Sequence, residues 1–236
     1  MRRPSWLKEQ YRRSKRLYRA FLNQDISASV QIRCKKMCLG NEHARWCISP
    51  SGISPRSVVY SFGIGQDVSF DLELIRLFGV SVHAFDPTPR SIEWLKFQDL
   101  PQQFVFHDYG IAEYDGTATF NPPDNLAHVS YSVVPRTEGS GPTVNAPVRR
   151  LTTIMETLGH RSVDLLKMDI EGAEYSVIRD LLSSQIQVDQ LLVEFHHERP
   201  EIGLVKTRQT VEQLNSAGFR IFDVSPSGQE FSFKRA

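Results

Sequence analysis

The sequence has no apolar run long enough to cross a membrane. A membrane-spanning helix needs about 18–20 consecutive apolar residues, and no stretch of the 236 residues approaches that length. The N-terminal segment is charged and has no apolar core of the kind found in secretory signals. We therefore expect a soluble protein and a cytoplasmic location.

The chain also has almost no net charge, because 28 basic residues oppose 27 acidic ones. A protein whose whole surface binds nucleic acid is strongly basic, so we expect no specific nucleic-acid binding. Basic residues are nevertheless concentrated near the N-terminus: Arg2, Arg3, Lys8, Arg12, Arg13, Lys15, Arg16 and Arg19. Aromatic residues and leucines alternate with them at near-helical spacing. We expect residues 1–50 to form a basic N-terminal helical extension, either packed on the main domain or in weak contact with an anionic membrane surface.

Cysteine is scarce, and its three copies are close together at Cys34, Cys38 and Cys47, with His43 between the last two. An odd number cannot be fully paired within one chain, which argues against a disulfide framework. Two alternatives stay open. We expect ordinary thiols in a reducing compartment, and a structural zinc site on these four residues is the second possibility.

Internal repeats and low-complexity tracts are absent, and a different regularity takes their place. After a segment rich in proline, glycine and serine at residues 48–57, apolar strands alternate with helical patterns. This alternation predicts a parallel sheet covered by helices on both faces. We expect residues 51–236 to form this α/β domain. Residues 116–151 break the rhythm with short β-like pieces among prolines and glycines, which predicts an inserted β-hairpin or meander.

The strand "VVYSF" runs into the glycine pair Gly63 and Gly65, but the third glycine of a dinucleotide-binding turn is missing. Val68 stands in its place, and Asp67 would lie near a pyrophosphate, which is electrostatically unfavourable. A nucleotide-linked oxidoreductase is therefore disfavoured. The turn suits a phosphate-free ligand that carries a cation, and S-adenosylmethionine has a sulfonium, an ammonium and a ribose.

Acidic residues end three apolar strands, at Asp86, Asp169 and Glu194. In an open α/β sheet, ligands bind beyond the carboxyl ends of the strands. Asp86, about twenty residues after the glycines, can accept hydrogen bonds from both ribose hydroxyls, each contributing about 1.5–3 kcal/mol. The alternative is that Asp86 caps the helix that follows it.

Four segments, "VVYSFGIGQDVSFD", "VHAFDPTPRSIEWL", "VDLLKMDIEGAEYSVI" and "LLVEFHH", resemble the FkbM-type S-adenosylmethionine-dependent methyltransferases. The resemblance covers about residues 58–224. It departs from the family where "SFGIGQD" replaces an asparagine-containing turn, and where Asp86 replaces a glutamate. It implies a Rossmann-like, mostly parallel seven-stranded sheet with a reversed last strand, helices on both faces, and the hairpin insertion before the fourth strand.

The resemblance also implies a set of cofactor-binding residues. The glycine turn would hold the methionine part, Asp86 the ribose and the turn at residues 108–112 the adenine, with Asp169 beside the methyl group. The full set is Phe62, Gly63, Gly65, Asp67, Ser69, Asp86, Gly110, Ile111 and Asp169.

The chemistry expected is methyl transfer to a hydroxyl group of a small molecule or a glycan. Asp169, Glu171 and His196 are the catalytic candidates, with His196 as base or substrate contact and Asp169 positioning the nucleophile. The same three residues could instead hold a divalent metal ion. His196 and His197 could also be ordinary polar residues at a strand end. A rival interpretation is a non-catalytic interaction protein on a methyltransferase-like fold that uses its basic N-terminal helix. The oligomeric state stays open.

Overall fold

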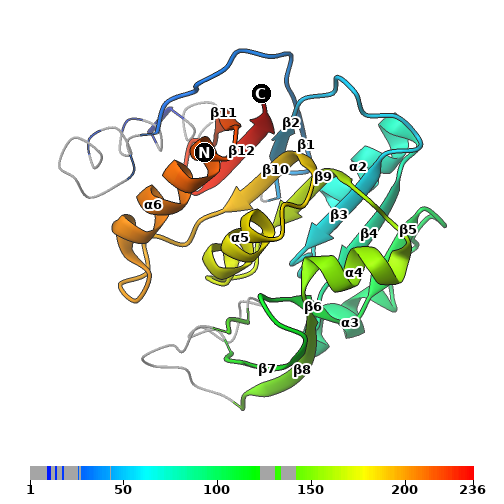
Figure 1. The fold of residues 1–236 in the computed structure, drawn as a ribbon. Coiled ribbons are helices and arrows are strands. Elements are labelled where there is room, and N and C mark those ends of the chain that lie inside the picture. The colour runs from blue at the N-terminus through cyan, green and yellow to red at the C-terminus, as the bar shows by residue number, and fades with distance from the viewer. Residues whose placement is uncertain are drawn as a thin grey trace, which may run out of the picture.

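The computed structural model describes residues 10, 11, 14, 18, 26, 28–42, 44–122, 131–133 and 142–236. Figure 1 shows the course of the chain, with the described helices and strands labelled. The basic N-terminal extension lies almost wholly outside the described residues, and so does His43. The basic N-terminal helix that the interaction-protein interpretation requires therefore lies almost wholly outside the described residues.

A seven-stranded sheet forms the centre of the molecule. Its five strands β5, β4, β3, β9 and β10 are mutually parallel, whereas β12 pairs antiparallel with both β10 and β11. The expected mostly parallel sheet with a reversed last strand is thus confirmed. In spatial order the strands are β5 (Phe104–His107), β4 (Ser81–Phe85), β3 (Val58–Phe62), β9 (Val163–Met168), β10 (Val188–Glu194), β12 (Glu230–Arg235) and β11 (Phe219–Val224).

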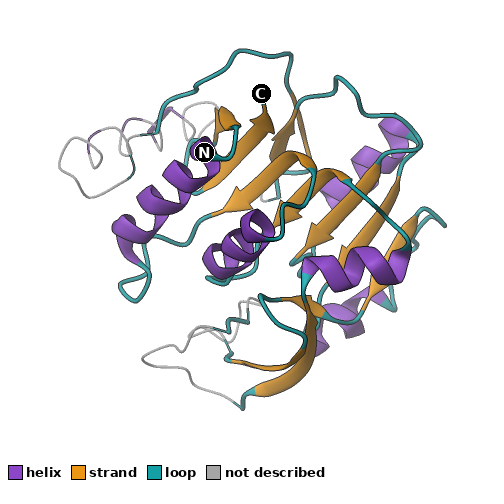
Figure 2. Cartoon of the chain, viewed as in Figure 1, coloured by secondary structure: helices purple, strands orange, loops and turns teal. Residues whose placement is uncertain are grey.

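Helices cover both faces of this sheet, as Figure 2 shows. Two hydrophobic clusters lie on opposite faces because the central strands carry apolar side chains on both sides. The helices on one face are α4 (Leu151–Leu158), α5 (Glu174–Ser183) and α6 (Gly203–Ser216). The helices on the other are α2 (Ser69–Phe78) and α3 (Pro89–Leu95).

The insertion before β9 is a small sheet below the main one (Figure 1). Strands β7 (Gly116–Phe120) and β8 (Val144–Arg149) pair antiparallel, which confirms the expected hairpin. A further short strand, β6 (Gly110–Ile111), pairs parallel with β8. Its two residues are too few to give a sequence pattern, so this third strand was not expected.

A second hairpin, β1 (Met37–Leu39) and β2 (Trp46–Ile48), precedes the main sheet. Leu39, Trp46 and Ile48 are buried in the same cluster as helix α2. After β2, the backbone N–H and C=O of Ser49 both hydrogen-bond the side-chain amide of buried Gln190 in β10, at 2.8 Å each. The domain boundary expected between residues 50 and 51 therefore lies between this hairpin and the sheet on which the hairpin packs.

The expectation that the cysteines are ordinary thiols was wrong for two of the three. Cys38 and Cys47 lie directly opposite each other in β1 and β2 and form a disulfide, and Cys34 remains free. With two sulfurs oxidised, the zinc alternative loses half of its four ligands. The hairpin register brings the two cysteines together, and spacing alone did not reveal that register.

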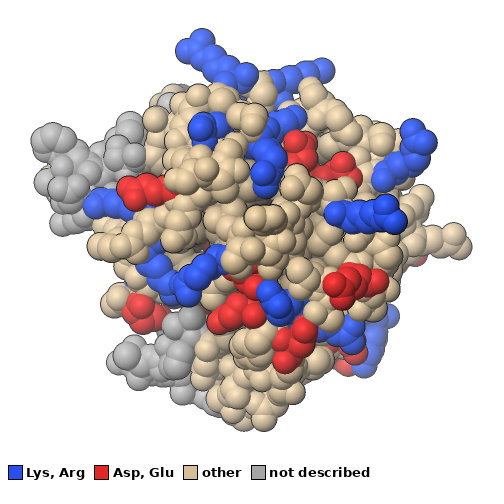
Figure 3. Space-filling model, in the orientation of Figure 1, with Lys and Arg blue, Asp and Glu red and all other residues tan. Residues whose placement is uncertain are grey.

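The surface carries both signs of charge. Lys and Arg side chains are interspersed with Asp and Glu over the face drawn in Figure 3. Within the described part of the chain, none of the helices is long and apolar enough to cross a membrane.

Removing the disulfide should destabilise the protein. Because the bridge closes a loop with a sequence separation of 9, the chain-entropy model assigns it about 2–3 kcal/mol. We expect the variant Cys38→Ser/Cys47→Ser to lose this much free energy of unfolding in urea under non-reducing conditions. Cys34→Ser is the matched control and should change by less than about 0.5 kcal/mol. Equal stability of the two variants would contradict the assignment.

Candidate active site

A pocket opens beyond the carboxyl ends of β3, β4, β9 and β10 and encloses a cavity of about 240 Å³. Helix α2 leaves β3 toward one face of the sheet, and α5 leaves β9 toward the other, so the pocket lies at the point where strand order reverses. Ligands bind at such points in open α/β sheets. The other walls come from the loop before β2 and from the insertion.

The glycine turn packs closely against the backbone at the end of β9. Gly63 and Gly65 have φ angles of 73° and 54°, which L side chains rarely adopt. A Cβ atom on Gly63 would lie 1.7 Å from the carbonyl oxygen of Asp169. The turn and the end of β9 can pack this closely only because Gly63 has no side chain.

Lys167 supports this turn from inside the sheet. Its ammonium donates hydrogen bonds to the carbonyl oxygens of Gly63 at 2.9 Å and Phe62 at 3.4 Å. The lysine is 6% exposed and lies near the buried carboxyl of Asp71. Burial raises the pKa of Asp71 to about 6, against the opposing effect of Lys167. The positive charge thus holds two carbonyl oxygens that would otherwise repel each other.

Asp86 lies at the end of β4 and is 4% exposed. Its Oδ1 accepts hydrogen bonds from the N–H and Oγ1 of Thr88, and its Oδ2 accepts one from the N–H of Gly65 at 2.9 Å. Burial raises the pKa of Asp86, and these hydrogen bonds oppose the shift. The Ser91 hydroxyl also contributes a hydrogen bond to this carboxylate. Asp86 therefore binds the start of α3 and also lines the pocket, and its contact with a ribose stays a prediction.

Asp67 and Ser69 differ in their position. Asp67 lines the pocket and accepts hydrogen bonds from the N–H of Ser69 at 2.9 Å and from the side-chain amide of Asn41. Ser69 is not among the pocket-lining residues, and its hydroxyl accepts the N–H of Asn41 at 3.0 Å. Asn41 thereby ties the loop of the β1–β2 hairpin to the glycine turn.

At the other end of the pocket, Gly110 and Ile111 form β6 and face the cavity. A Cβ atom on Gly110 would lie 3.2 Å from Pro87. Phe120, Tyr131 and Val133 of the insertion line the same end. This end of the pocket is therefore lined mainly by apolar and aromatic residues.

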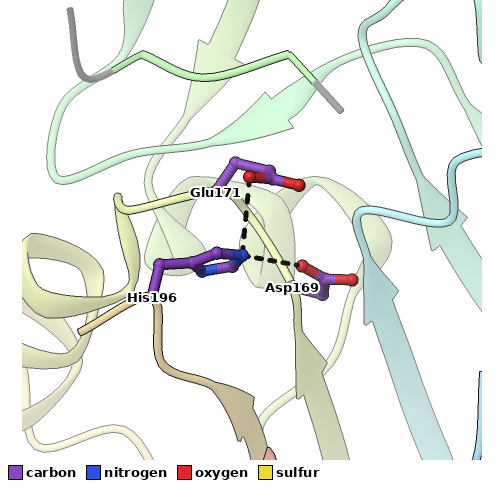
Figure 4. Close-up of side chains that lie close together, drawn as sticks. All are labelled: Asp169, Glu171 and His196. Atoms are coloured by element: carbon purple, nitrogen blue, oxygen red, sulfur yellow. Dashed lines mark ion pairs between the residues drawn. The ribbon is translucent and has the colours of Figure 1, made fainter. Parts of the chain in front are cut away.

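Figure 4 shows Asp169, Glu171 and His196 side by side at the ends of β9 and β10. Nε2 of His196 lies 3.4 Å from Glu171 and 3.8 Å from Asp169, and its Nδ1 lies 3.3 Å from Glu174. Glu171 also forms an ion pair with Arg199. Asp169 and Glu171 line the pocket, whereas His196 is 4% exposed and lies behind them.

The pKa values of this cluster respond to its high density of carboxylates. Burial alone would lower the pKa of His196, but Glu174 first, and then Asp169 and Glu194, raise it to about 10. Burial, together with repulsion from Asp169 and Glu230, raises the pKa of Glu194 well above its ordinary value. His196 is therefore a cation at neutral pH when no other cation is bound.

The structure brings most of the expected residues together around one cavity. The expected residues that line it are Phe62, Gly63, Gly65, Asp67, Asp86, Gly110, Ile111, Asp169 and Glu171. Ser69 and His196 do not line it. Lys167, Trp46 and Glu230 do, and sequence reasoning missed all three. A single lysine inside the apolar run "VDLLKMD" was a usable signal for Lys167, but Trp46 and Glu230 reach the pocket only through tertiary packing.

The sequence is similar to a known family and to two curated proteins. A family model described as "Methyltransferase FkbM domain" matches residues 57–221. The proteins described as probable methyltransferase-like protein 24 of Rattus norvegicus and of Homo sapiens are each 26% identical to the chain over 175 residues. Each match covers 70% of this chain, and it covers 42% of the rat and 41% of the human protein. The chain therefore spans about two fifths of the length of these relatives.

Among solved structures, fibrillarin from Aeropyrum pernix, crystallised with natively bound S-adenosyl-L-methionine, is similar with a TM-score of 0.39. The sequences are 8% identical, and the alignment covers 89% of this chain and 85% of that one.

The contact at Gly63 generates a prediction with a matched control. Gly159 has the same φ of 73°, but nothing lies within 4 Å of its added Cβ. Gly159→Ala should cost about 1–2 kcal/mol of unfolding free energy, which is the cost of the left-handed backbone alone. Gly63→Ala should cost about 1–3 kcal/mol more because of the clash with Asp169. Urea unfolding of both variants measures the difference, and equal losses would show that the close contact is not present.

Proposed function

The chain belongs to the FkbM methyltransferase family, and its cofactor is S-adenosylmethionine; from this premise we propose that it methylates a hydroxyl oxygen of a small molecule or a glycan. The observation that carries the proposal is the convergence of the glycine turn, Asp86 and Asp169 on one pocket at the carboxyl ends of the strands. These elements are distant in the sequence, and only the sheet brings them together.

The residues present fit the cofactor in three respects. The turn at Gly63 and Gly65 exposes backbone without side chains, so that it can hold the methionine part. Asp86 lines the pocket at the end of β4, where its carboxylate can accept a hydrogen bond from a ribose hydroxyl. Ile111 is apolar and lies beside Gly110, where a ring can pack on it. When bound, S-adenosylmethionine supplies an electrophilic methyl group on a sulfonium, and the carboxylates of the pocket stabilise this positive charge.

Asp169 is the residue best placed to act on the acceptor. Its side chain is 30% exposed and faces the cavity, whereas that of His196 is 6% exposed and lies behind it. We therefore assign the proton-accepting oxygen to Asp169, and we assign to His196 the role of positioning Asp169 and Glu171. This reverses the order of roles expected from the sequence. A positioned base of this kind contributes about 10²–10⁴-fold to a rate.

The catalytic unit includes the β1–β2 hairpin. Arg45 and Trp46 line the pocket, and Asn41 binds Asp67 and Ser69 beside the glycine turn. We therefore propose that the methyltransferase domain begins before residue 37, with the basic segment as its extension.

Two isosteric variants test the assignment. Asp86→Asn keeps an oxygen for Thr88 but removes the charge, and should weaken binding of the demethylated cofactor, S-adenosylhomocysteine, by about 10–100-fold. Asp169→Asn should bind it within about threefold of wild type, yet transfer labelled methyl groups at least about 100-fold more slowly. Titration calorimetry measures the first effect, and labelled S-adenosylmethionine with a panel of hydroxylated acceptors measures the second.

The exposed Glu93→Gln is the control and should alter neither quantity. If the wild-type protein bound neither S-adenosylmethionine nor its product, the proposal would be wrong. Binding without transfer to any acceptor would favour the interaction-protein alternative.

We propose an oxidising compartment as the place of action, instead of the expected cytoplasm. The Cys38–Cys47 disulfide carries this part of the proposal, because cytosolic thiols are usually kept reduced. Protein isolated from its native cells and alkylated before reduction should carry the label on Cys34 alone. Labelling of all three cysteines would place it in a reducing environment.

A further inference from the structure

Three side-chain atoms that can ligate a metal ion converge beside the pocket. One ligand atom each from Asp169, Glu171 and His196 lies within 4.8 Å of the others (Figure 4). The imidazole Nε2 is 3.4 Å from the carboxylate of Glu171 and 3.8 Å from that of Asp169. An ion 2.0–2.1 Å from each of three ligands in tetrahedral directions separates them by about 3.4 Å. The 3.4 Å separation matches this value and the 3.8 Å separation lies close to it, so small side-chain movements would let the three residues hold one metal ion.

Glu174 orients the imidazole from behind. It is fully buried, and its two oxygens accept the N–H groups of Ile170 and Gly172 at 2.9 Å each. Its Oε1 lies 3.3 Å from Nδ1 of His196 and thereby favours a proton on that nitrogen. Nε2 then faces two carboxylates, whose negative charge either a second proton or a metal ion at Nε2 can balance. A carboxylate behind a ligating histidine is the usual outer shell of metal sites.

The backbone of Glu171 is held in an unusual conformation that places its carboxylate in this cluster. Its φ is 58°, a left-handed value that is costly for a residue other than glycine. Its carbonyl oxygen accepts hydrogen bonds from Ser132 at 2.6 Å and Arg199 at 3.1 Å. Arg199 also pairs with the carboxylate, which has lone pairs enough for both an arginine and a metal ion.

We propose that Asp169, Glu171 and His196 bind one divalent transition-metal ion, of the class of Mn²⁺, at the floor of the pocket. Two carboxylates and one imidazole form a mixed oxygen and nitrogen donor set, which suits such ions better than Mg²⁺ or Ca²⁺. Three protein ligands leave coordination positions open, and two of the three ligands line the cavity. If the proposed methyl transfer is correct, the open positions accept the acceptor's hydroxyl oxygen and the ion lowers its pKa.

Mn²⁺ binding to the chelator-treated full chain tests the site directly, by titration calorimetry and by the loss of the free-ion signal in electron paramagnetic resonance. Wild type should bind one ion. Asp169→Asn, Glu171→Gln and His196→Gln should each weaken binding at least about tenfold. Glu174→Gln, which changes a residue that is not itself a ligand, should weaken it by about 10–100-fold. Asp189→Asn is the control. It lies in β10, the strand that precedes His196, and should change Mn²⁺ binding less than twofold. Circular dichroism shows which variants are folded.

Absence of stoichiometric Mn²⁺ binding to the folded wild type, or equal binding by the Asp169→Asn and Asp189→Asn variants, would overturn the proposal. S-adenosylhomocysteine binding, measured on the same samples, separates this result from the proposed function. If the protein binds S-adenosylhomocysteine but does not bind Mn²⁺, only the metal site is rejected. If it binds Mn²⁺ but does not bind S-adenosylhomocysteine, the metal site is supported and the proposed methyl transfer is rejected.

Discussion

The close contact between Gly63 and the backbone of Asp169 is the constraint on which the site depends. The N–H of Asp169 donates to the carbonyl oxygen of Phe62 at 3.1 Å, and a Cβ on Gly63 would lie 1.7 Å from the carbonyl oxygen of Asp169. This packing sets the glycine turn and the proposed catalytic residue Asp169 side by side. A methyl transferase needs this arrangement, because methyl donor and acceptor must be aligned in line and within contact distance.

Charge balance is the second constraint. The pocket gathers Asp67, Asp86, Asp169, Glu171, Glu194 and Glu230 around few basic groups. Lys167 lies inside the sheet and His196 behind the acids, and both stabilise the fold of the site without filling the cavity. The remaining negative charge favours a cationic occupant, and Asp169 would lie beside both of the proposed ones, the sulfonium of the cofactor and the metal ion.

Much of the fold could be predicted from the sequence, because strand and helix patterns and the strand-end acids are local signals. The turn at Gly63 and the ends at Asp86 and Asp169 were recognisable for this reason. The disulfide, the short strand β6 and the position of Trp46 depend on register and tertiary packing, which no local pattern records. Sequence order places His196 at a strand end but does not reveal its depth, and its burial behind Asp169 is the reason that we propose the reverse of the roles expected from the sequence. Ser69 was expected in the pocket, yet it turns toward Asn41.

A crystal structure with S-adenosylhomocysteine bound tests the central claim most directly. The account predicts that a ribose hydroxyl donates to Oδ2 of Asp86, that the adenine packs on Ile111, and that Asp169 borders the space beside the sulfur from which the methyl group leaves. A ligand bound elsewhere, or one whose sulfur points away from Asp169, would contradict it.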